Sequence, residues 1–445
     1  MQTNLDRIAR FREEISRAER LTPEQLARYA QARLAALCDF ARRNTPYYRK
    51  RLAPAFPGDN FDFSRWDQVP VLTRELTNKR YMELRAARLP AQAGDVQEDR
   101  TSGSTGTPLR FLTCAAQLES DQAFSNRAYD WWGMDGTKNY AGIHAYIGVD
   151  HRHLSEEGNQ GWRFDVMVGR QYGCPLHWPI DFMLEWIPRK NIRYLTTRPA
   201  NLELLAEEAL RRGVGRKLGL EVVMTVGGPL LPHVRELSQA AFGLPVRDTY
   251  GSQECGNLAI DCPQCGMLHL NEEGKLIEIL REDGTPCEPG ETGRVLVTPH
   301  VAYAMPLVRY DTGDFAELAD RPNLCGRPHR SLTRVLGRHT EAFVRRDGSR
   351  FFPSTQAKLF GDYLPFEQIQ IVQTDYDVIE LRYVPQPGDR PIDHDGLQRY
   401  VRRELGEAFT ARLVPVAEIP RPLGAKFLYH LCQVPMPPPR LFASA

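Results

Sequence analysis

The chain has 445 residues, of which 42% are hydrophobic and 25% charged, as in a globular protein large enough for at least two domains. Its formal net charge of only +1 excludes a global field that would attract nucleic acid or an anionic membrane. The charged N-terminal segment, the lack of an apolar run of bilayer length and the odd number of nine cysteines predict a cytoplasmic protein with reduced thiols.

Residues 1 to about 95 are expected to be mostly helical. Thr22-Pro23-Glu24-Gln25 has the features of a helix start, namely a capping hydroxyl, a first-turn proline and a glutamine at the capping-box position. Apolar residues then recur at helical spacing as far as Phe40. The later segment WDQVPVLTRELTNKRY (66–81) predicts a short strand, a turn and a helix.

From Asp99 onward, short β-like runs alternate with helical segments such as 200–213, which has two arginines in its last turn and ends at Gly213. This alternation predicts an α/β fold in which sheets are layered with helices. Strand-like runs predominate after Leu268, and the last part of the chain mixes strands with one helix. We therefore expect a large domain over residues 1–338 and a small, mobile α+β lid domain over residues 339–445.

The segment TSGSTGTP (101–108) is a candidate phosphate-binding loop. Its glycines allow the backbone to approach an oxyanion, and its hydroxyl and amide groups can donate hydrogen bonds to phosphate. It lacks the GxxxxGK[ST] pattern of the common nucleotide-binding loop, and a flexible connection between two strands is the alternative interpretation. The candidate phosphate ligands are Ser102, Gly103, Ser104, Thr105, Gly106 and Thr107.

Two later segments each place a carboxylate after a strand and a tight turn. In DTYGSQE (248–254), Tyr250, Gly251 and Glu254 suit a platform for ring stacking next to a Mg²⁺ ligand. In LVRYDTGD (307–314), Asp314 is placed to accept hydrogen bonds from both hydroxyls of a ribose. Plain strand-to-turn junctions are the alternative for both segments, and neither is decisive alone.

Cysteine spacing indicates a zinc knuckle. Cys262 and Cys265 are separated by two residues on a predicted tight turn, so both thiolates can bind one tetrahedral ion. His269 follows them, and Cys325 lies in a CGR segment that resembles half of a second knuckle. We predict a structural zinc site in the hairpin 255–269 together with Cys325, with Cys255 as the substitute fourth ligand. Reduced cysteines on a plain hairpin are the alternative.

The order of the segments is more specific than any one of them. TSGSTGTP, GGP (227–229), YGSQE, RYDTGD, LGR (336–338) and PRPLGAK (420–426) follow one another as in the adenylate-forming superfamily, which the chain resembles. The N-terminal segments LAALCDFARRNTPYYRKRL and WDQVPVLTREL resemble those of the phenylacetate-CoA ligase family within it. The resemblance implies an enzyme that uses ATP and Mg²⁺ to convert an aryl or arylacetic acid to an acyl-adenylate, releases pyrophosphate and transfers the acyl group to CoA. It also implies a homodimer.

The resemblance also implies a role for each matching residue. The loop from Ser102 to Thr107 would hold the ATP phosphates, and Lys426 would move in with the lid to stabilise charge during adenylation. Gly227, Gly228 and Pro229 would line the adenine and acyl pocket, and Tyr250, beside the turn at Gly251, would stack on adenine. Glu254 would bind Mg²⁺. Asp314 would bind the ribose, and Arg338 would bind ribose or phosphate.

The sequence departs from the family pattern at three positions. Thr107 stands where the phosphate loop usually has lysine, Gln253 replaces the threonine before the glutamate, and Thr340 replaces the hinge aspartate, although Glu341 follows. Because lid rotation at the hinge normally opens the thiol-transfer arrangement, an amine or another nucleophile is an alternative acceptor. A catalytically silent, zinc-containing binding protein of the same fold is a further alternative.

Overall fold

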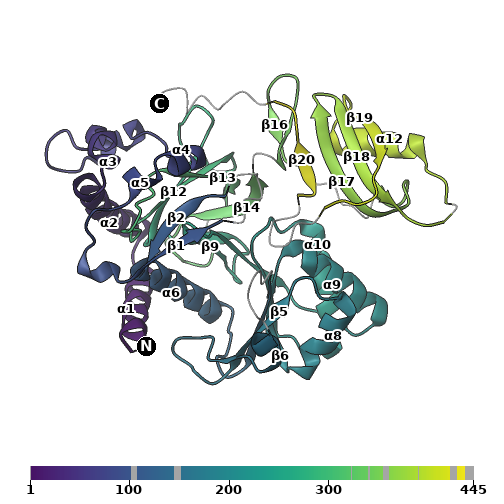
Figure 1. Ribbon diagram of the computed structural model, residues 1–445, viewed down its shortest axis with the longest axis horizontal. Helices are drawn as coiled ribbons and strands as arrows, with labels where there is room; N and C mark the ends of the chain where they lie inside the picture. Colours follow the sequence, from purple (N-terminus) through teal and green to yellow (C-terminus); the bar gives the residue numbers. More distant parts are fainter. Residues whose placement is uncertain are drawn as a thin grey trace. The chain divides into compact units, whose positions relative to one another are not determined.

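The computed structural model describes residues 2–101, 108–144, 152–321, 323–338, 341–353, 360–388, 390–420 and 428–435. The chain divides between Val335 and Leu336 into two compact units (Figure 1). None of the helices among these residues is long and apolar enough to cross a membrane.

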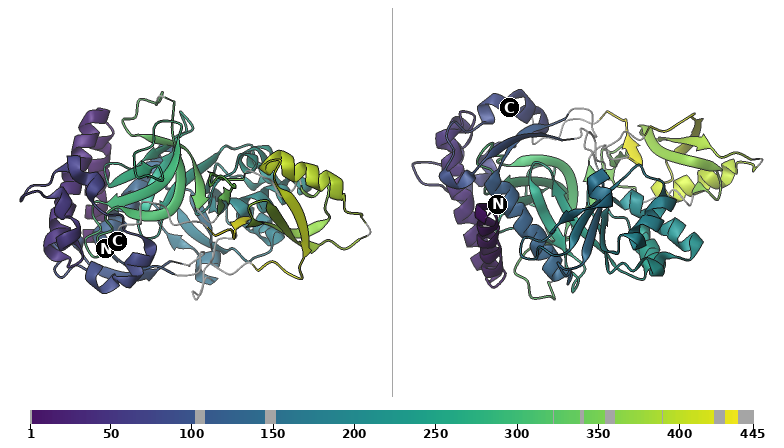
Figure 2. Two further views of the ribbon diagram at one scale, coloured as in Figure 1. Left: turned by 90° about the horizontal axis from the view of Figure 1, so that it is seen from above. Right: turned by 60° about the horizontal axis from the view of Figure 1, so that its bottom comes forward.

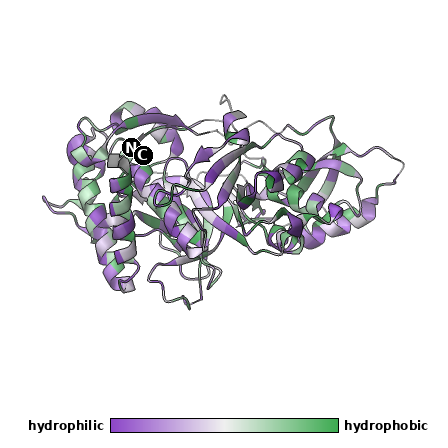
Figure 3. Ribbon diagram, turned by 90° about the horizontal axis from the view of Figure 1, so that it is seen from below, coloured by the Kyte–Doolittle hydropathy of each residue, from purple (hydrophilic) through white to green (hydrophobic). Residues whose placement is uncertain are grey.

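The first unit begins with helices. Thr22 accepts a hydrogen bond from the Gln25 amide, and the Gln25 side chain accepts one from the Thr22 amide, which confirms the predicted capping box. Figure 2 shows these purple helices beside the green strands, and Figure 3 shows hydrophobic and hydrophilic residues mixed along them, as expected for helices with one buried face. Their bounds are α1 (Gln2–Ala18), α2 (Pro23–Asn44), α3 (Tyr48–Arg51), η1 (Ala53–Ala55), η2 (Phe63–Gln68), α4 (Arg74–Lys79), α5 (Tyr81–Leu84) and η3 (Ala91–Ala93).

A twelve-stranded sheet has the order β11-β12-β13-β14-β10-β9-β8-β7-β6-β3-β5-β4. In the part of the sheet with the order β5-β3-β6-β7-β8, all neighbouring strands are parallel, as expected where helices connect them. Helix α9 ends at Gly213 in a left-handed conformation, which confirms the predicted helix end. The elements are α6 (Ala115–Trp131), β3 (Asn139–His144), α7 (Arg152–Glu156), β4 (Asn159–Gln160), β5 (Arg170–Pro175), α8 (Ile180–Arg189), β6 (Ile192–Thr197), α9 (Pro199–Arg212), η4 (Gly215–Leu218), β7 (Val222–Thr225), α10 (Pro232–Phe242) and β8 (Val246–Ser252).

Strand β8 joins the parallel half to an antiparallel half, because it pairs in parallel with β7 and antiparallel with β9. The YGSQE segment therefore lies where the strand directions change. A separate antiparallel hairpin, β1–β2, flanks the predicted phosphate loop. The remaining strands are β1 (Val96–Arg100), β2 (Arg110–Cys114), β9 (Gly256–Asp261), β10 (Leu268–Leu270), β11 (Lys275–Leu280), β12 (Thr292–Pro299), β13 (Tyr310–Leu318) and β14 (Ser331–Arg338).

The second unit is a small α+β structure, as the sequence predicts. A four-stranded sheet of order β19-β18-β17-β20 shares a buried core with α12, which Asp393 caps by accepting a hydrogen bond from the Gly396 amide (2.8 Å). A two-stranded sheet, β15–β16, precedes it. The elements are β15 (Phe343–Val344), β16 (Arg350–Phe351), β17 (Phe366–Asp375), β18 (Val378–Pro385), α12 (His394–Leu405), β19 (Thr410–Pro415) and β20 (His430–Cys432).

Candidate functional site

Two of the predicted nucleotide-binding segments meet where β8 ends. The Tyr250 hydroxyl donates a hydrogen bond to Asp314 Oδ2, and the Tyr310 hydroxyl donates one to Glu254 Oε1, both at 3.0 Å. Burial, followed by the neighbouring carboxylate, raises the pKa of each tyrosine well above its usual value, so both remain donors. We call Tyr250, Glu254, Tyr310 and Asp314 the tyrosine–carboxylate cluster. It joins YGSQE to RYDTGD in one place.

The GGP segment follows the neighbouring strand β7. Gly227 has a left-handed backbone (φ 73°), and no atom of the described residues lies within 4 Å of the position that a Cβ would occupy. The turn therefore favours glycine, and its outer face is open. Thr225, the last residue of β7, donates a hydrogen bond to Asp248 Oδ1 on β8 (2.8 Å), so the ends of the two strands are tied side by side.

The structure brings together the four predicted zinc ligands Cys262, Cys265, His269 and Cys325, whose ligand atoms all lie within 4.8 Å of one another. His269 Nε2 is 3.3 Å from Cys265 Sγ and 3.2 Å from Cys325 Sγ. A tetrahedral zinc ion holds sulfur and nitrogen ligands about 3.5–3.8 Å apart. The two nitrogen–sulfur distances are slightly shorter than this, so a small outward shift of the side chains would seat an ion among the four ligands. Cys255, the substitute fourth ligand in the sequence analysis, is not a member of this cysteine–histidine cluster.

The surroundings of the cysteine–histidine cluster also suit a metal. Burial lowers the pKa of His269 to about 4, so its ring is neutral at pH 7, and its Nδ1 lies 3.4 Å from the His329 carbonyl oxygen. Arg327 donates a hydrogen bond to Cys262 Sγ (3.1 Å), and its guanidinium lies over the Trp131 ring at 4.0 Å. Trp131, the last residue of α6, therefore packs beside this cluster.

Segment 66–76 is held against RYDTGD, which the sequence did not predict. Leu72 pairs in parallel with Tyr310: the Leu72 amide donates to the Arg309 carbonyl, and the Asp311 amide donates to the Leu72 carbonyl, both at 3.0 Å. The Arg309 guanidinium forms an ion pair with Glu278 (3.0 Å). It also donates hydrogen bonds to the carbonyl oxygens of Trp66 (3.3 Å), Asp67 (2.9 Å) and Val69 (2.7 Å).

Comparisons with known proteins agree with this architecture. Phenylacetate-coenzyme A ligase from Thermus thermophilus is 26% identical over 259 residues, which make up 52% of this chain and 58% of that enzyme. 2-Hydroxyisobutyryl-CoA ligase, in the postadenylation state with 2-HIB-AMP, has a TM-score of 0.75 at 18% identity, covering 94% of this chain and 92% of that one. This chain has the acyl-CoA ligase fold. No family model matches it.

Further solved structures with the acyl-CoA ligase fold extend the comparison. The same 2-hydroxyisobutyryl-CoA ligase in complex with 2-HIB-AMP and CoA has a TM-score of 0.60 at 18% identity, covering 93% of this chain and 91% of that one. The anthranilate CoA ligase AuaEII with anthranoyl-AMP has a TM-score of 0.53 at 15% identity, covering 76% of this chain and 66% of that one. The resemblance read from the motif order is confirmed, because the curated relative and these neighbours are acid-CoA ligases. The curated alignment spans little more than half of that relative.

The remaining predicted site residues belong to the second unit or lie outside the described residues. Arg338, the last residue of β14, belongs to the second unit, and its amide donates to Glu341 Oε1 (3.3 Å). The phosphate loop Ser102–Thr107 and Lys426 lie outside the described residues. Within the first unit, the structure thus joins the tyrosine–carboxylate cluster and leaves the predicted roles of the loop and the lysine as proposals.

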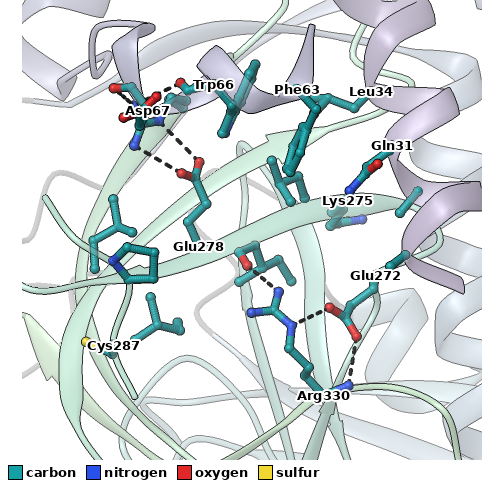
Figure 4. Close-up of a pocket in the computed structure, with 18 of the residues that line it drawn as sticks. Gln31, Leu34, Phe63, Trp66, Asp67, Glu272, Lys275, Glu278, Cys287 and Arg330 are labelled. Atoms are coloured by element: carbon teal, nitrogen blue, oxygen red, sulfur yellow. Dashed lines mark hydrogen bonds and ion pairs between the residues drawn. The ribbon is translucent and has the colours of Figure 1, made fainter. Parts of the chain in front are cut away.

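A cavity of about 550 Å³ lies between α2, η2 and β11, and Figure 4 shows its lining. Four of its charged groups form two ion pairs, Glu278 with Arg309 (3.0 Å) and Glu272 with Arg330 (2.7 Å), and Lys275 pairs with Asp121 outside the lining (2.8 Å). None of the four tyrosine–carboxylate cluster residues lines it. The cavity is therefore separate from the tyrosine–carboxylate cluster, although Arg309 of the RYDTGD segment lines it.

The carboxyl group of Asp248, two residues before Tyr250 on β8, predicts that the stability of the protein depends on pH. Burial raises its pKa to about 7, so between pH 4 and 7 the native state binds one proton more than the unfolded state. We therefore expect this group's contribution to stability to fall, by a few kcal/mol in all, as pH rises through that range. Urea unfolding of the wild type and Asp248→Asn from pH 4 to 8 measures it. A difference between the two that does not change with pH would contradict the assignment.

Proposed function

We propose that the chain uses ATP to activate a carboxylic acid as its acyl-adenylate, releases pyrophosphate, and transfers the acyl group to CoA. The observation that supports this most directly is the tyrosine–carboxylate cluster, which unites two nucleotide-binding segments within an acyl-CoA ligase fold. An aryl or arylacetic acid is the proposed substrate, since the curated relative is named for phenylacetate and one structural neighbour holds anthranoyl-AMP.

The chemistry of adenylation explains which kinds of groups the site needs. A substrate carboxylate oxygen attacks the α-phosphorus of ATP, the bond to the bridging oxygen breaks, and pyrophosphate leaves. Because two anions approach each other, cations and amide donors near the phosphates matter more than a strong base. We assign the ribose hydroxyls to Asp314, the phosphates to loop 102–107 and the developing charge to Lys426. Glu254, a buried carboxylate, would hold the Mg²⁺ that accompanies ATP.

We assign a structural Zn²⁺ to Cys262, Cys265, His269 and Cys325. Four protein ligands leave no open position, so the ion would not take part in the reaction. It would fix the turn between β9 and β10, and β9 begins two residues after Glu254. The ion would thereby stabilise the hairpin next to the proposed Mg²⁺ ligand.

The test is pyrophosphate release from ATP and Mg²⁺ with aryl, arylacetic and aliphatic acids, each with and without CoA. We expect acid-dependent release, a thioester product with CoA, and a loss of about 100-fold or more in Lys426→Ala, because a cation at the transition state is removed. Release without a thioester, even with CoA, would favour an amine or other acceptor, consistent with Thr340 at the hinge. No release with any acid, together with no ATP binding, would contradict the proposal.

A further inference from the structure

Arg74 lies between the base of the predicted phosphate loop and the proposed Mg²⁺ ligand. Its Nη1 donates a hydrogen bond to Thr101 Oγ1 (3.0 Å), and its Nη2 is 3.6 Å from Glu254 Oε1. Thr101 Oγ1 also accepts a hydrogen bond from the Leu109 amide (3.0 Å), so it closes the base of the segment that the two residues bracket. One guanidinium thus contacts both the base of the predicted phosphate loop and the proposed Mg²⁺ ligand.

The backbone of Arg74 is fixed by local structure on both sides. Thr73 caps α4 by accepting a hydrogen bond from the Leu76 amide (3.1 Å), and Arg74 is the first residue of that helix. Leu72, two residues earlier, forms the parallel bridge to Tyr310. The Arg74 side chain is therefore presented from a rigid support, which favours a positioned cation over a solvated one.

Arg74 neutralises the charge of Glu254 in the absence of ligand and can pair with phosphate when nucleotide binds. Glu254 is only 3% exposed, and a buried carboxylate needs a nearby cation, which Arg74, 20% exposed, supplies. If Glu254 binds Mg²⁺, that ion takes over its charge, and the guanidinium fork can turn to phosphate oxygens. The segment TSGSTGTP (101–108) contains no lysine or arginine, so a cation for the phosphates comes from another part of the chain.

We propose that Arg74 binds the β- and γ-phosphates of ATP and the departing pyrophosphate, and so compensates for the lysine missing at Thr107. This inference rests on the proposed function and names a residue for its pyrophosphate side. The acyl group and the AMP moiety do not depend on Arg74. The adenylation half-reaction should therefore need Arg74, and transfer from a preformed acyl-adenylate should not.

The first experiment measures binding of MgATP and of AMP by calorimetry to the wild type, Arg74→Gln, Arg74→Lys and Lys79→Gln. Lys79→Gln is the matched control, because it removes an exposed cation from the same helix. We expect Arg74→Gln to weaken MgATP binding about 10-fold or more without changing AMP binding, and Arg74→Lys to lose less. Equal weakening of both nucleotides, or of neither, would overturn the proposal.

The second experiment separates the two half-reactions, using the acid that gives most pyrophosphate release. Arg74→Gln should lower acid-dependent pyrophosphate exchange about 100-fold, yet form thioester from prepared acyl-adenylate and CoA at the wild-type rate. A parallel loss in both half-reactions would show a merely structural role and refute the inference. If the wild type releases no pyrophosphate with any acid but still binds MgATP, the MgATP and AMP binding measurements decide the role of Arg74 by themselves.

Discussion

Replacing Cys265 or Cys325 with serine is expected to remove zinc from the protein and to destabilise the β9–β10 hairpin. Each serine removes one of four ligands whose atoms lie within 4.8 Å of one another. Because a metal that binds only the folded state adds its binding free energy to the stability of that state, we expect the free energy of unfolding of the first unit to fall by about 3 kcal/mol or more. Zinc content by elemental mass spectrometry should fall from about one ion per chain to near zero.

The control for this prediction is Cys255→Ser. Cys255 is buried and close in sequence, but the structure places it outside the cysteine–histidine cluster. This variant should therefore keep its zinc, whereas His269→Asn should lose it. Amide hydrogen exchange of peptides covering 256–270 would show whether the destabilisation is local to the hairpin. Loss of zinc in Cys255→Ser with retention in His269→Asn would reverse the ligand assignment.

Features that depend on neighbouring residues were readable from the sequence. The Thr22 capping box and the end of α9 at Gly213 follow from chemistry within one helical turn. Three of the four predicted zinc ligands lie within eight residues of one another, and the CGR segment around Cys325 indicated the fourth. Local spacing was therefore sufficient for three of the ligands, whereas Cys325, 56 residues from His269, was indicated by its own CGR turn.

Long-range pairing was not readable in the same way. The segment around Leu72 and the RYDTGD segment were both noted, yet nothing in either indicates that their backbones pair. Backbone hydrogen bonds have no side-chain pattern, so Arg74 could not be placed beside Glu254 before the structure. Trp131 illustrates the same limit of spacing, since an aromatic residue in a ligand pocket and one packed beside His269 look alike in the sequence.

Arg309→Met is expected to be among the most destabilising single changes in the first unit, although Arg309 belongs to a predicted nucleotide-binding segment. The arginine is 4% exposed, and its removal leaves Glu278, 12% exposed, without its ion-pair partner. It also removes the guanidinium that donates to three backbone carbonyls, of which that of Trp66 keeps a hydrogen bond from the Val69 amide. Breaking a buried ion pair from one side costs about 3–5 kcal/mol. Arg309 has a left-handed backbone (φ 48°), which is as unfavourable for methionine as for arginine. The difference in unfolding free energy between the wild type and Arg309→Met therefore measures the loss of the side-chain contacts alone.

A double-mutant cycle in urea, followed by circular dichroism, tests this explanation. Arg309→Met with Glu278→Gln should be less destabilising than the sum of the two single changes, because no charge is then left unpaired. The matched control is Arg330→Met on the same cavity wall, where the partner is Glu272 and the arginine is 46% exposed (Figure 4). Because solvent screens this exposed pair, the loss of unfolding free energy in Arg330→Met should stay below about 1 kcal/mol. Equal losses for Arg309→Met and Arg330→Met would mean that burial of the Arg309 pair does not stabilise the contact between segment 66–76 and RYDTGD.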